Sequence, residues 1–533
     1  MKEESYHPFC GREEPGVVED HIMADEDQEH PRKKPVPDAG EVRRPRLPVP
    51  LDEGERPRSA SRIIAPEQAR PRGMKRFGAG VLVAYDALGV ELVLIIGFLV
   101  LIAGGTVLLL LPAATPADQP ISFVDALFTS TSAVCVTGLA VRDTGTAFTT
   151  FGQTVILALI QLGGLGIMTV SAFFLVILRK RLTRRDASSL ESVFDVERKG
   201  GIRRIVMGII ACTFLVEGIG ALLLLPSVKE GGDGRALFEA VFHSISATCN
   251  AGFGLYPDSL VRFRSSLPVN LLIMALIVIG GIGFTVVFDL VGALRRLKTE
   301  KRLLSLHTRV VLATTAVLLV SGTAVFLLCE AHRTLEPLSQ GERVLASAFQ
   351  SVTLRTAGFS TLDFSEMQPA TLFLVLLFMF IGGSPGSTAG GIKTTTFAIA
   401  LATLWARSRG RESVVLFKRT IPEYLCTRAL LIFILGFVVL STAMVLLMLS
   451  EAHDLEGSHG REHFLDLLFE AVSAFGTVGL STGWTPRLSE GGRIIIILLM
   501  FLGRVGPLTV AVAMGGRKKK PSATYPEGRV MIG

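Results

Sequence analysis

The stretch LLFEAVSAFGTVGL, residues 467–480, begins like an apolar helix and ends in a short loop that closes on a glycine. Three other stretches align with it when their final glycines are placed in register: ALFTSTSAVCVTGL (126–139), AVFHSISATCNAGF (240–253) and ASAFQSVTLRTAGF (346–359). Leu or Phe follows that glycine in all four stretches. This recurrence predicts one structural motif that is repeated four times.

Further matches extend the repeat in both directions from the loop. Three stretches carry Phe ten residues and Ser six residues before the final glycine (Phe128, Phe242, Phe469; Ser132, Ser246, Ser473), whereas the third has Ala348 and Val352 there. Some 24 to 28 residues after each glycine follows a second cluster: QLGGLG (161–166), VIGGIG (278–283), FIGGSPG (380–386) and FLGRVG (501–506). Four paired matches indicate internal duplication, each unit being outer helix, half-helix, Gly-ended loop and inner helix.

The composition places these units in a membrane. The chain has 533 residues, of which 49% are hydrophobic, and its mean hydropathy is positive. Eight segments approach the roughly 20 apolar residues that a membrane-spanning helix needs: Leu92–Leu111, Thr154–Leu178, Ile205–Leu225, Val269–Val291, Val310–Leu328, Leu372–Ile381 with its continuation, Leu430–Leu449 and Ile494–Ala513. The predicted fold is an all-α integral membrane protein with eight spans, four re-entrant half-helices and pseudo-fourfold symmetry.

The placement of charge predicts the orientation. Lys and Arg gather in the connections at 179–204, 294–309 and 405–420, whereas the alternate connection at 111–121 is nearly free of them. Basic connections face the cytoplasm, so we expect a multi-pass plasma-membrane protein with both termini cytoplasmic. The six cysteines are scattered without a CxxC pair, so neither a zinc site nor a disulfide framework is indicated.

These patterns divide the chain into six parts. Residues 1–78 hold 11 of the 25 prolines with mixed charges, which predicts a disordered cytoplasmic tail without the apolar region of a signal peptide. The four pore units occupy 79–187, 188–299, 300–418 and 419–516, and residues 517–533 form a C-terminal cytoplasmic tail.

Four re-entrant loops satisfy their backbone by facing one another across a water-filled path, because loop backbone is not tolerated against lipid. The segment before each glycine can then present carbonyl oxygens that replace the water shell of a cation. The half-helices direct their partially negative C-terminal ends at the same centre. Glycine permits a backbone conformation or a close approach that a side chain would obstruct. The repeat therefore predicts a cation pathway.

At this point the chain resembles the Ktr/Trk/HKT superfamily of potassium transporters, and most of all its KtrB-type membrane subunit. The resemblance rests on SAVCVTGL (132–139), CNAGF (249–253), RTAGF (355–359), SAFGTVGLSTG (473–483), GSTAGGIKTTTF (386–397), GRVGPLT (503–509) and YPEGRVMIG (525–533). GTVG (476–479) is also similar to the core of the potassium-channel filter. In this superfamily four filter glycines go with potassium selectivity, and Ser at one of them goes with sodium permeation.

The repeat and the resemblance together predict the filter. It comprises Val134, Cys135, Val136, Thr137, Gly138; Thr248, Cys249, Asn250, Ala251, Gly252; Leu354, Arg355, Thr356, Ala357, Gly358; and Phe475, Gly476, Thr477, Val478, Gly479. Potassium is expected to bind the backbone carbonyls of Val136, Thr137, Asn250, Ala251, Thr356, Ala357, Thr477 and Val478. The thiols of Cys135 and Cys249 are interpreted as packed side chains.

The resemblance also implies partners. It implies a homodimer in the lipid bilayer that docks to a cytoplasmic ring of nucleotide-binding subunits of the KtrA/TrkA type, with sodium as a modulator. Potassium, and sodium in that modulating role, are the implied ions. No covalent cofactor, nucleic-acid partner or enzymatic activity is expected, since no Ser/His/Asp or paired-carboxylate spacing occurs in the spans. Nucleotide would act only through the regulatory partner.

The stretch FMFIGGSPGSTAGGIKTTTFAIA (378–400) interrupts the third inner helix with small and polar residues. A phosphate-binding P-loop is disfavoured because Ile392 separates Gly391 from Lys393. A broken helix that holds a transported substrate is a second reading. The repeat favours, and the resemblance names, a third: an intramembrane gate formed by Gly386, Ser387, Thr388, Ala389, Gly390, Gly391, Lys393 and Arg504.

Charges inside the spans leave alternatives open. Lys393 either reaches towards the cytoplasmic interface or faces water or a partner, since an unpaired membrane cation costs roughly 2.5–3.5 kcal/mol. Arg504 replaces the glycine found in the other three units; it is either an electrostatic barrier, a hydrogen-bond donor to loop carbonyls, or both.

Other charges are read first as structural. Glu217 and Asp289 are taken as helix-packing groups rather than ion relays, and Asp125, Glu239 and Glu470 as anchors of the half-helices. Arg355 is expected to brace the third loop through an ion pair with an acid such as Asp466 or Glu470.

A rival from another functional class is a secondary transporter that alternates access around the broken helix. It predicts stoichiometric coupling to protons or sodium. A gated pore predicts flux that follows the potassium electrochemical gradient.

Overall fold

The computed structural model describes residues 90–177, 202–229, 234–296, 304–452, 463–506 and 509, all of which belong to one compact unit, Met74–Gly533. These residues are mostly helical. The predicted tails at 1–78 and 517–533, and the basic connection at 179–201, lie outside the described residues. The predicted boundaries of the four units therefore stay predictions.

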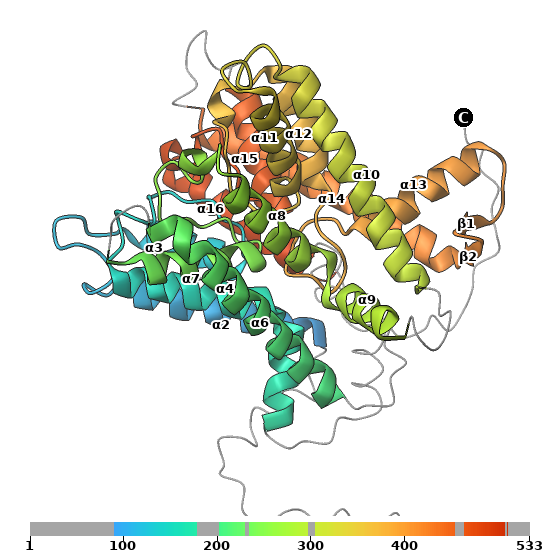
Figure 1. Ribbon diagram of the computed structural model, residues 1–533, viewed down its shortest axis with the longest axis horizontal. Helices are drawn as coiled ribbons and strands as arrows, with labels where there is room; N and C mark the ends of the chain where they lie inside the picture. The colour runs from blue at the N-terminus through green and yellow to red at the C-terminus, as the bar shows by residue number, and fades with distance from the viewer. Residues whose placement is uncertain are drawn as a thin grey trace, which may run out of the picture. The chain divides into compact units, whose positions relative to one another are not determined.

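The first half of the described chain contains seven helices (Figure 1): α2 (Val90–Leu109), α3 (Phe123–Val134), α4 (Thr150–Ile177), α6 (Ile202–Lys229), α7 (Ala236–Thr248), α8 (Leu267–Ile282) and α9 (Phe284–Arg296). The second half adds α10 (Leu306–Cys329), α11 (Gln340–Thr353), α12 (Pro369–Phe380), α13 (Thr394–Ser408), α14 (Glu423–Ser450), α15 (Phe464–Gly476) and α16 (Glu490–Val505). Single 3₁₀ turns lie at Val261–Phe263, Phe364–Glu366 and Thr485–Arg487.

One element departs from the all-α prediction. Strands β1 (Val414–Leu416) and β2 (Arg419–Ile421) pair as an antiparallel hairpin after α13. Its two turn residues, Phe417 and Lys418, both have positive φ values of 49° and 62°. This left-handed pair is the backbone that a two-residue hairpin needs, and hydropathy carries no signal for it.

Packing between the helices follows one rule around the fold. Each short helix packs on the long helix that precedes it: α3 on α2, α7 on α6, α11 on α10 and α15 on α14. The helix after each loop then packs on the next short helix, so α4 contacts α7, α8 contacts α11, α12 contacts α15, and α16 contacts α3. The last contact returns to the first unit, so the helices form a closed circuit.

A serine hydroxyl fixes three of the short helices to their outer helices. Ser130, Ser244 and Ser351 each donate a hydrogen bond of 2.7 Å to a carbonyl of the preceding long helix, namely those of Ile102, Glu217 and Leu319. Glycine faces each serine from that helix, because a side chain there would overlap the hydroxyl: Gly105, Gly220 and Gly322. Each buried hydroxyl thereby has a hydrogen-bond partner, as buried polar groups require.

The inner helices all break at the second glycine cluster. Gly166, Gly283, Gly386 and Gly506 have φ values of 72°, 89°, 72° and 90°, a region that L side chains rarely enter. At Gly283 the chain bends by 101° between α8 and α9. The predicted span Val269–Val291 therefore consists of two helices joined at Gly283, a bend that hydropathy does not register because both halves are apolar.

Three described helices are long and apolar enough to cross a membrane: Val206–Lys229, Leu306–Cys329 and Glu423–Ser450. The bent pair α8 and α9 raises this to four. The remaining predicted spans correspond to shorter helices, to α4 with its break at Gly166, and to the interrupted pair α12 and α13. A mostly helical membrane fold is supported, and the eight-span topology stays a prediction.

Candidate functional site

The four predicted filter segments share one unusual backbone conformation. Two residues before each final glycine, the chain enters the left-handed region, with φ of 56°, 58°, 64° and 51° at Val136, Asn250, Thr356 and Thr477. The final glycines also have positive φ, from 71° to 95°. Asn tolerates this conformation, but for β-branched Val and Thr it is strained. Strain that recurs at equivalent positions marks a functional segment.

The residues before this point are helical or directly follow a helix. Val134, Thr248 and Gly476 are the last residues of α3, α7 and α15, and Leu354 caps α11. Phe475 is likewise helical, and Cys135, Cys249 and Arg355 follow directly after the helices or their caps. The non-helical part of each segment is therefore short.

Hydroxyl groups hold each segment in place. Ser132 donates to the Leu139 carbonyl at 2.7 Å and accepts from the Gly138 N–H at 3.1 Å. Ser246 donates in the same way to the Phe253 carbonyl, and Ser473 accepts from the Gly479 N–H. These bonds explain why Ser recurs six residues before the glycine.

The third segment keeps this bond with a different residue. It has Val352 at the Ser position, but Thr353, one residue later, donates to the Phe359 carbonyl at 2.5 Å. The buried Phe is shifted in the same direction, because Phe349 rather than residue 348 is fully buried. The apparent departure in the sequence is therefore a shift of one residue in the half-helix.

The four final glycines contact one another in a ring. A methyl carbon added to Gly138 would lie 3.1 Å from the Cα of Gly252, and one added to Gly252 would lie 2.7 Å from the Cα of Gly358. Added to Gly358, it would lie 3.4 Å from the Cα of Gly479, and added to Gly479, 3.0 Å from the Cα of Gly138. No side chain fits into this ring without moving backbone.

Each glycine is also approached by a carbonyl of the next segment. These carbonyls belong to the residue before the final glycine: Ala251 faces Gly138, Ala357 faces Gly252, Val478 faces Gly358, and Thr137 faces Gly479. All four residues are fully or almost fully buried. Four of the eight predicted potassium-binding carbonyls thus lie at the ring of glycines. The other four belong to the left-handed residues that directly precede them in the chain.

The interrupting loop lies against the second and fourth filter segments. The hydroxyl of Thr388 lies 3.2 Å from the Gly280 carbonyl and 3.3 Å from that of Thr248. On the other side, Gly390 faces Thr477 so closely that a side chain at 390 would overlap it. A carbon added to Gly391 would lie 3.1 Å from the Gly476 carbonyl.

The base of the loop is closed by its own hydrogen bonds. The N–H of Gly382 donates to the Ile392 carbonyl at 2.8 Å, and that of Thr394 to the Gly383 carbonyl at 3.0 Å. Ser387 donates to the Ser384 carbonyl at 2.7 Å. The loop, including Thr388 and Ala389, which are almost fully buried, is an ordered plug rather than an open connection.

Both predicted gate cations are bound to loop carbonyls. The Arg504 guanidinium donates to the carbonyls of Thr388 in the loop and Gly163 in α4. Lys393 donates to the Ala389 carbonyl at 2.5 Å. This contact favours a lysine bound to a partner over one that extends to the cytoplasmic interface. Arg504 is a structural hydrogen-bond donor, and its positive charge lies beside the same loop.

The predicted ion pair of Arg355 with Asp466 or Glu470 is wrong. Arg355 is almost fully buried, and its guanidinium donates to the Gly382 carbonyl at 3.1 Å. Glu470 is instead satisfied by Ser481 and Thr485, each at 2.5 Å, and by the N–H of Thr482. The carboxylate therefore holds the loop that follows its own filter segment.

Other half-helix acids have the anchoring role that was predicted. Asp125 is nearly buried and pairs with Arg142 at 3.2 Å and with Arg493 of α16 at 2.7 Å. Glu239 accepts from the Tyr256 hydroxyl at 2.8 Å. These bonds tie the first unit to the fourth and the second half-helix to its own loop.

The buried carboxyl of Glu217 contacts the second filter segment. It accepts from the Gln161 amide at 3.1 Å and lies 3.7 Å from the Cys249 thiol. Cys135 and Cys249 are both fully buried, in agreement with packed thiols. Asp289 accepts from Thr308 at 2.6 Å, which joins α9 to α10. Both acids therefore make the packing contacts that were expected of them.

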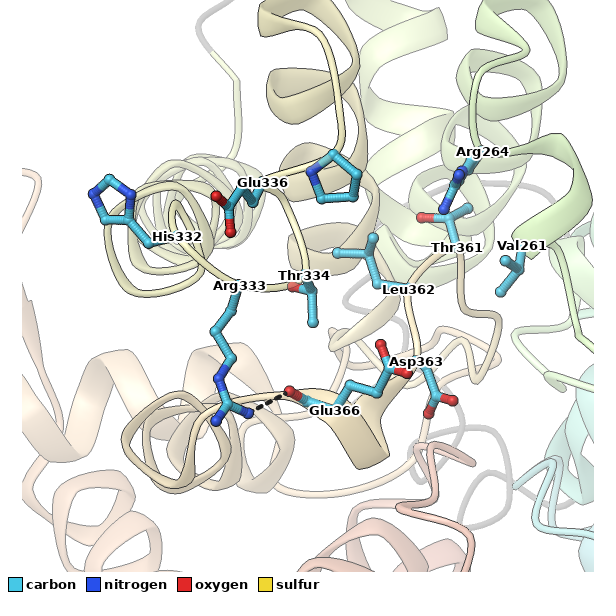
Figure 2. Close-up of a pocket in the computed structure, with 11 residues that line it drawn as sticks. Val261, Arg264, His332, Arg333, Thr334, Glu336, Thr361, Leu362, Asp363 and Glu366 are labelled. Atoms are coloured by element: carbon cyan, nitrogen blue, oxygen red, sulfur yellow. Dashed lines mark hydrogen bonds between the residues drawn. The ribbon is translucent and has the colours of Figure 1, made fainter.

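A separate polar pocket of about 710 Å³ lies beside the loops that follow the second and third filter segments (Figure 2). Arg333 donates to the Glu366 carbonyl there at 3.1 Å, and Glu336 and Asp363 also line the pocket. Arg264 also lines the pocket, so its charges of opposite sign offset one another. Among the described residues, no group of three or more His, Cys, Asp and Glu side chains is placed to hold a metal ion there.

The chain is similar to known proteins over most of its length. The family model TrkH, described as a cation transport protein, matches residues 85–526. The chain belongs to the TrkH/Ktr family. This TrkH/Ktr chain is 41% identical to the Ktr system potassium uptake protein B of Bacillus subtilis (strain 168), over 83% of its own length and 96% of that protein.

Two further relatives have similar sequence identity to this TrkH/Ktr chain. The Ktr system potassium uptake protein B of Vibrio alginolyticus is 39% identical over 83% of this chain and 94% of that protein. The potassium/sodium uptake protein NtpJ of Enterococcus hirae is 38% identical over 82% of this chain and 96% of that protein. The resemblance to the KtrB-type subunit is confirmed.

A solved structure shares the fold. The crystal structure of the potassium transporter TrkH from Vibrio parahaemolyticus superposes with a TM-score of 0.60, at 20% identity, over 79% of this TrkH/Ktr chain and 83% of that one. At this identity the likeness concerns the fold alone.

Proposed function

We propose that this chain is the membrane subunit of a potassium uptake system, and that potassium crosses the membrane through the ring of filter glycines. The observation that carries the proposal is the mutual contact of Gly138, Gly252, Gly358 and Gly479. Relatives named as potassium uptake proteins over nearly their whole length support the choice of ion.

The filter works by replacing water. A potassium ion sheds its hydration shell and is held by the carbonyls of Val136, Thr137, Asn250, Ala251, Thr356, Ala357, Thr477 and Val478. The short helices α3, α7, α11 and α15 end at this centre, so their C-terminal dipole ends favour a cation. Pseudo-fourfold symmetry of four units, eight spans and cytoplasmic termini complete the proposed architecture.

The interrupting loop is the gate of this pore. It lies against two filter segments, and Arg504 and Lys393 are bound to it, so ions pass when the loop leaves this position. The positive charge of Arg504 adds an electrostatic barrier to cations in the closed state. Flux then follows the potassium gradient and the membrane potential.

The proposal includes partners around the pore, which the resemblance to the family supports. The pore subunit forms a homodimer in the cell membrane, a cytoplasmic nucleotide-binding ring regulates it, and sodium modulates it. Nucleotide acts through that ring, and the chain itself carries no covalent cofactor and catalyses no reaction.

Uptake by the whole protein tests the proposal. The chain is expressed, alone and with a candidate regulatory ring, in a bacterium that lacks its own potassium uptake, and growth on low potassium is measured. We expect the chain to restore growth. Absence of restoration under both conditions, with the protein present in the membrane, contradicts the proposal.

The filter assignment has its own test. Gly358→Ser should raise sodium uptake relative to potassium, because a carbon at 358 would lie 2.8 Å from both the Gly252 Cα and the Val478 carbonyl and would open the ring. Gly341→Ser, at a helical glycine with open space around it, is the control. Unchanged selectivity in Gly358→Ser contradicts the filter. Fixed coupling of potassium to protons or sodium favours the secondary transporter.

A further inference from the structure

Asn250 differs from its counterparts in the other three filter segments. The equivalent residues are Val136, Thr356 and Thr477, whose short β-branched side chains cannot reach far from the backbone. Asn250 is fully buried and carries a carboxamide, which can accept at one end and donate at the other. Asn also suits the left-handed conformation here (φ 58°), so its presence costs less strain than Val or Thr.

Both ends of this carboxamide are bound to functional segments. Its oxygen lies 3.3 Å from the hydroxyl of Thr388 in the gate loop, and its nitrogen donates to the Arg355 carbonyl of the third filter segment at 3.3 Å. Gly280 makes room for it, since a carbon added there would lie 2.6 Å from the Asn250 oxygen. One side chain thus joins two filter segments and the loop.

Thr388 has one proton to donate and three acceptors within reach. These are the Asn250 oxygen and the carbonyls of Thr248 and Gly280, at 3.2 to 3.3 Å. Two of the three acceptors belong to the second filter segment. Movement of the loop therefore takes this hydroxyl away from both filter acceptors, and a change in the second filter segment changes the contacts that hold Thr388.

We propose that Asn250 is a positioning residue that couples the filter to the gate loop, so that the ion in the filter sets how readily the loop opens. The inference rests on the proposed function and deepens it. Coupling is reciprocal: if the ion changes loop opening, then loop opening changes ion affinity by the same factor. The carboxamide transmits the change because the Arg355 carbonyl and the Thr388 hydroxyl bind opposite ends of one planar group.

The experiment measures loop exposure in two ionic conditions. Full-length protein carrying Ser387→Cys in the loop is reconstituted in liposomes and treated with a charged thiol reagent, in potassium or in N-methylglucamine, which is too large for the filter. The protein without this substitution gives the background from native cysteines. We expect the labelling rate to differ roughly fivefold between the two cations, the size that one neutral hydrogen bond supports.

Thr388→Val and Asn250→Thr should each remove this ion dependence, so that the two labelling rates become equal. Combined, they should have no further effect on the ratio. Thr394→Val is the matched control, because its hydroxyl bonds Ser384 at 3.0 Å within the loop base and makes no bond to the filter. It should change both rates by one factor and keep their ratio.

The outcomes separate coupling from a structural role. A merely structural role of Asn250 alters labelling equally in both cations, so a ratio that survives in Thr388→Val overturns the inference. A ratio of one in the protein with native Thr388 and Asn250 also overturns it. Potassium uptake that is retained in either case leaves the proposed function standing, whereas absent uptake counts against the proposed function itself.

Discussion

Arg504 offers the sharpest test of the gate. Arg504→Ala removes two hydrogen bonds from a charged donor, one to the Thr388 carbonyl in the loop and one to the Gly163 carbonyl in α4. A bond of this kind contributes roughly 1.5–3 kcal/mol. When the loop opens, water replaces part of what the guanidinium loses. We therefore assign the two hydrogen bonds together the free energy of one such bond.

That contribution converts to a change in the opening equilibrium of roughly 10- to 150-fold. Removal of the positive charge acts in the same direction, since it lowers the barrier to cations beside the loop. We therefore expect the initial rate of potassium uptake into proteoliposomes, at limiting potassium and fixed membrane potential, to rise about tenfold or more. The increase in the uptake rate stops at the point where passage through the filter, rather than opening of the loop, limits the rate.

The control is a second arginine on the same helix. Arg493→Ala removes the ion pair with Asp125 and makes no contact with the loop, so it should lower stability without raising uptake. If Arg504→Ala assembles in normal amounts and its uptake is unchanged or lower, Arg504 does not hold the loop closed. The gate reading would then be refuted in favour of a substrate site in the broken helix.

Two more changes test the ring and its supports. Gly252→Ala should abolish selective uptake, because at φ 71° its added carbon would lie 2.7 Å from the Gly358 Cα; Gly218→Ala, in open space, should leave uptake intact in the same flux assay. Asp125→Asn should cost roughly 3 kcal/mol, since it removes the buried carboxylate that pairs with Arg142 and Arg493. The exposed Asp258→Asn should cost under about 1 kcal/mol. Unfolding in detergent measures both losses, and equal losses would contradict the anchoring role.

The sequence predicted the repeated segments well because their spacing is set by backbone geometry. Each unit has a final glycine with positive φ and a hydroxyl group that bonds the backbone at or directly after that glycine, so Gly138 and Ser132 have counterparts along the chain. Even the exception follows this rule, since Thr353 supplies the hydroxyl one residue later. A constraint that only one or two residue types can meet, such as a positive φ or a hydroxyl hydrogen bond, can be recognised in the sequence.

Partners of buried charges could not be predicted in the same way. Arg355 bonds a backbone carbonyl and Glu470 bonds hydroxyl groups, and every residue offers a carbonyl. The type of a residue therefore does not indicate whether its carbonyl accepts a hydrogen bond from a buried charge. The preference for an acid as the partner of an arginine failed because local hydroxyl donors already satisfied the nearest carboxylate.

The closed circuit of helices and the single loop answer different physical needs. In the proposed function, a dehydrated ion is held by equivalent ligands on all sides. This accounts for the left-handed residue and the glycine that occur in all four units. Closing a pore needs one obstruction only. The second glycine cluster can accordingly differ between units. The first two units keep Gly164 and Gly281, and the third inserts the loop. The fourth carries Arg504, whose guanidinium bonds the loop of the third unit. In the proposed function, an obstruction built by two adjacent units can be released by one movement of the loop, and the Thr388 hydroxyl links that movement to the second filter segment.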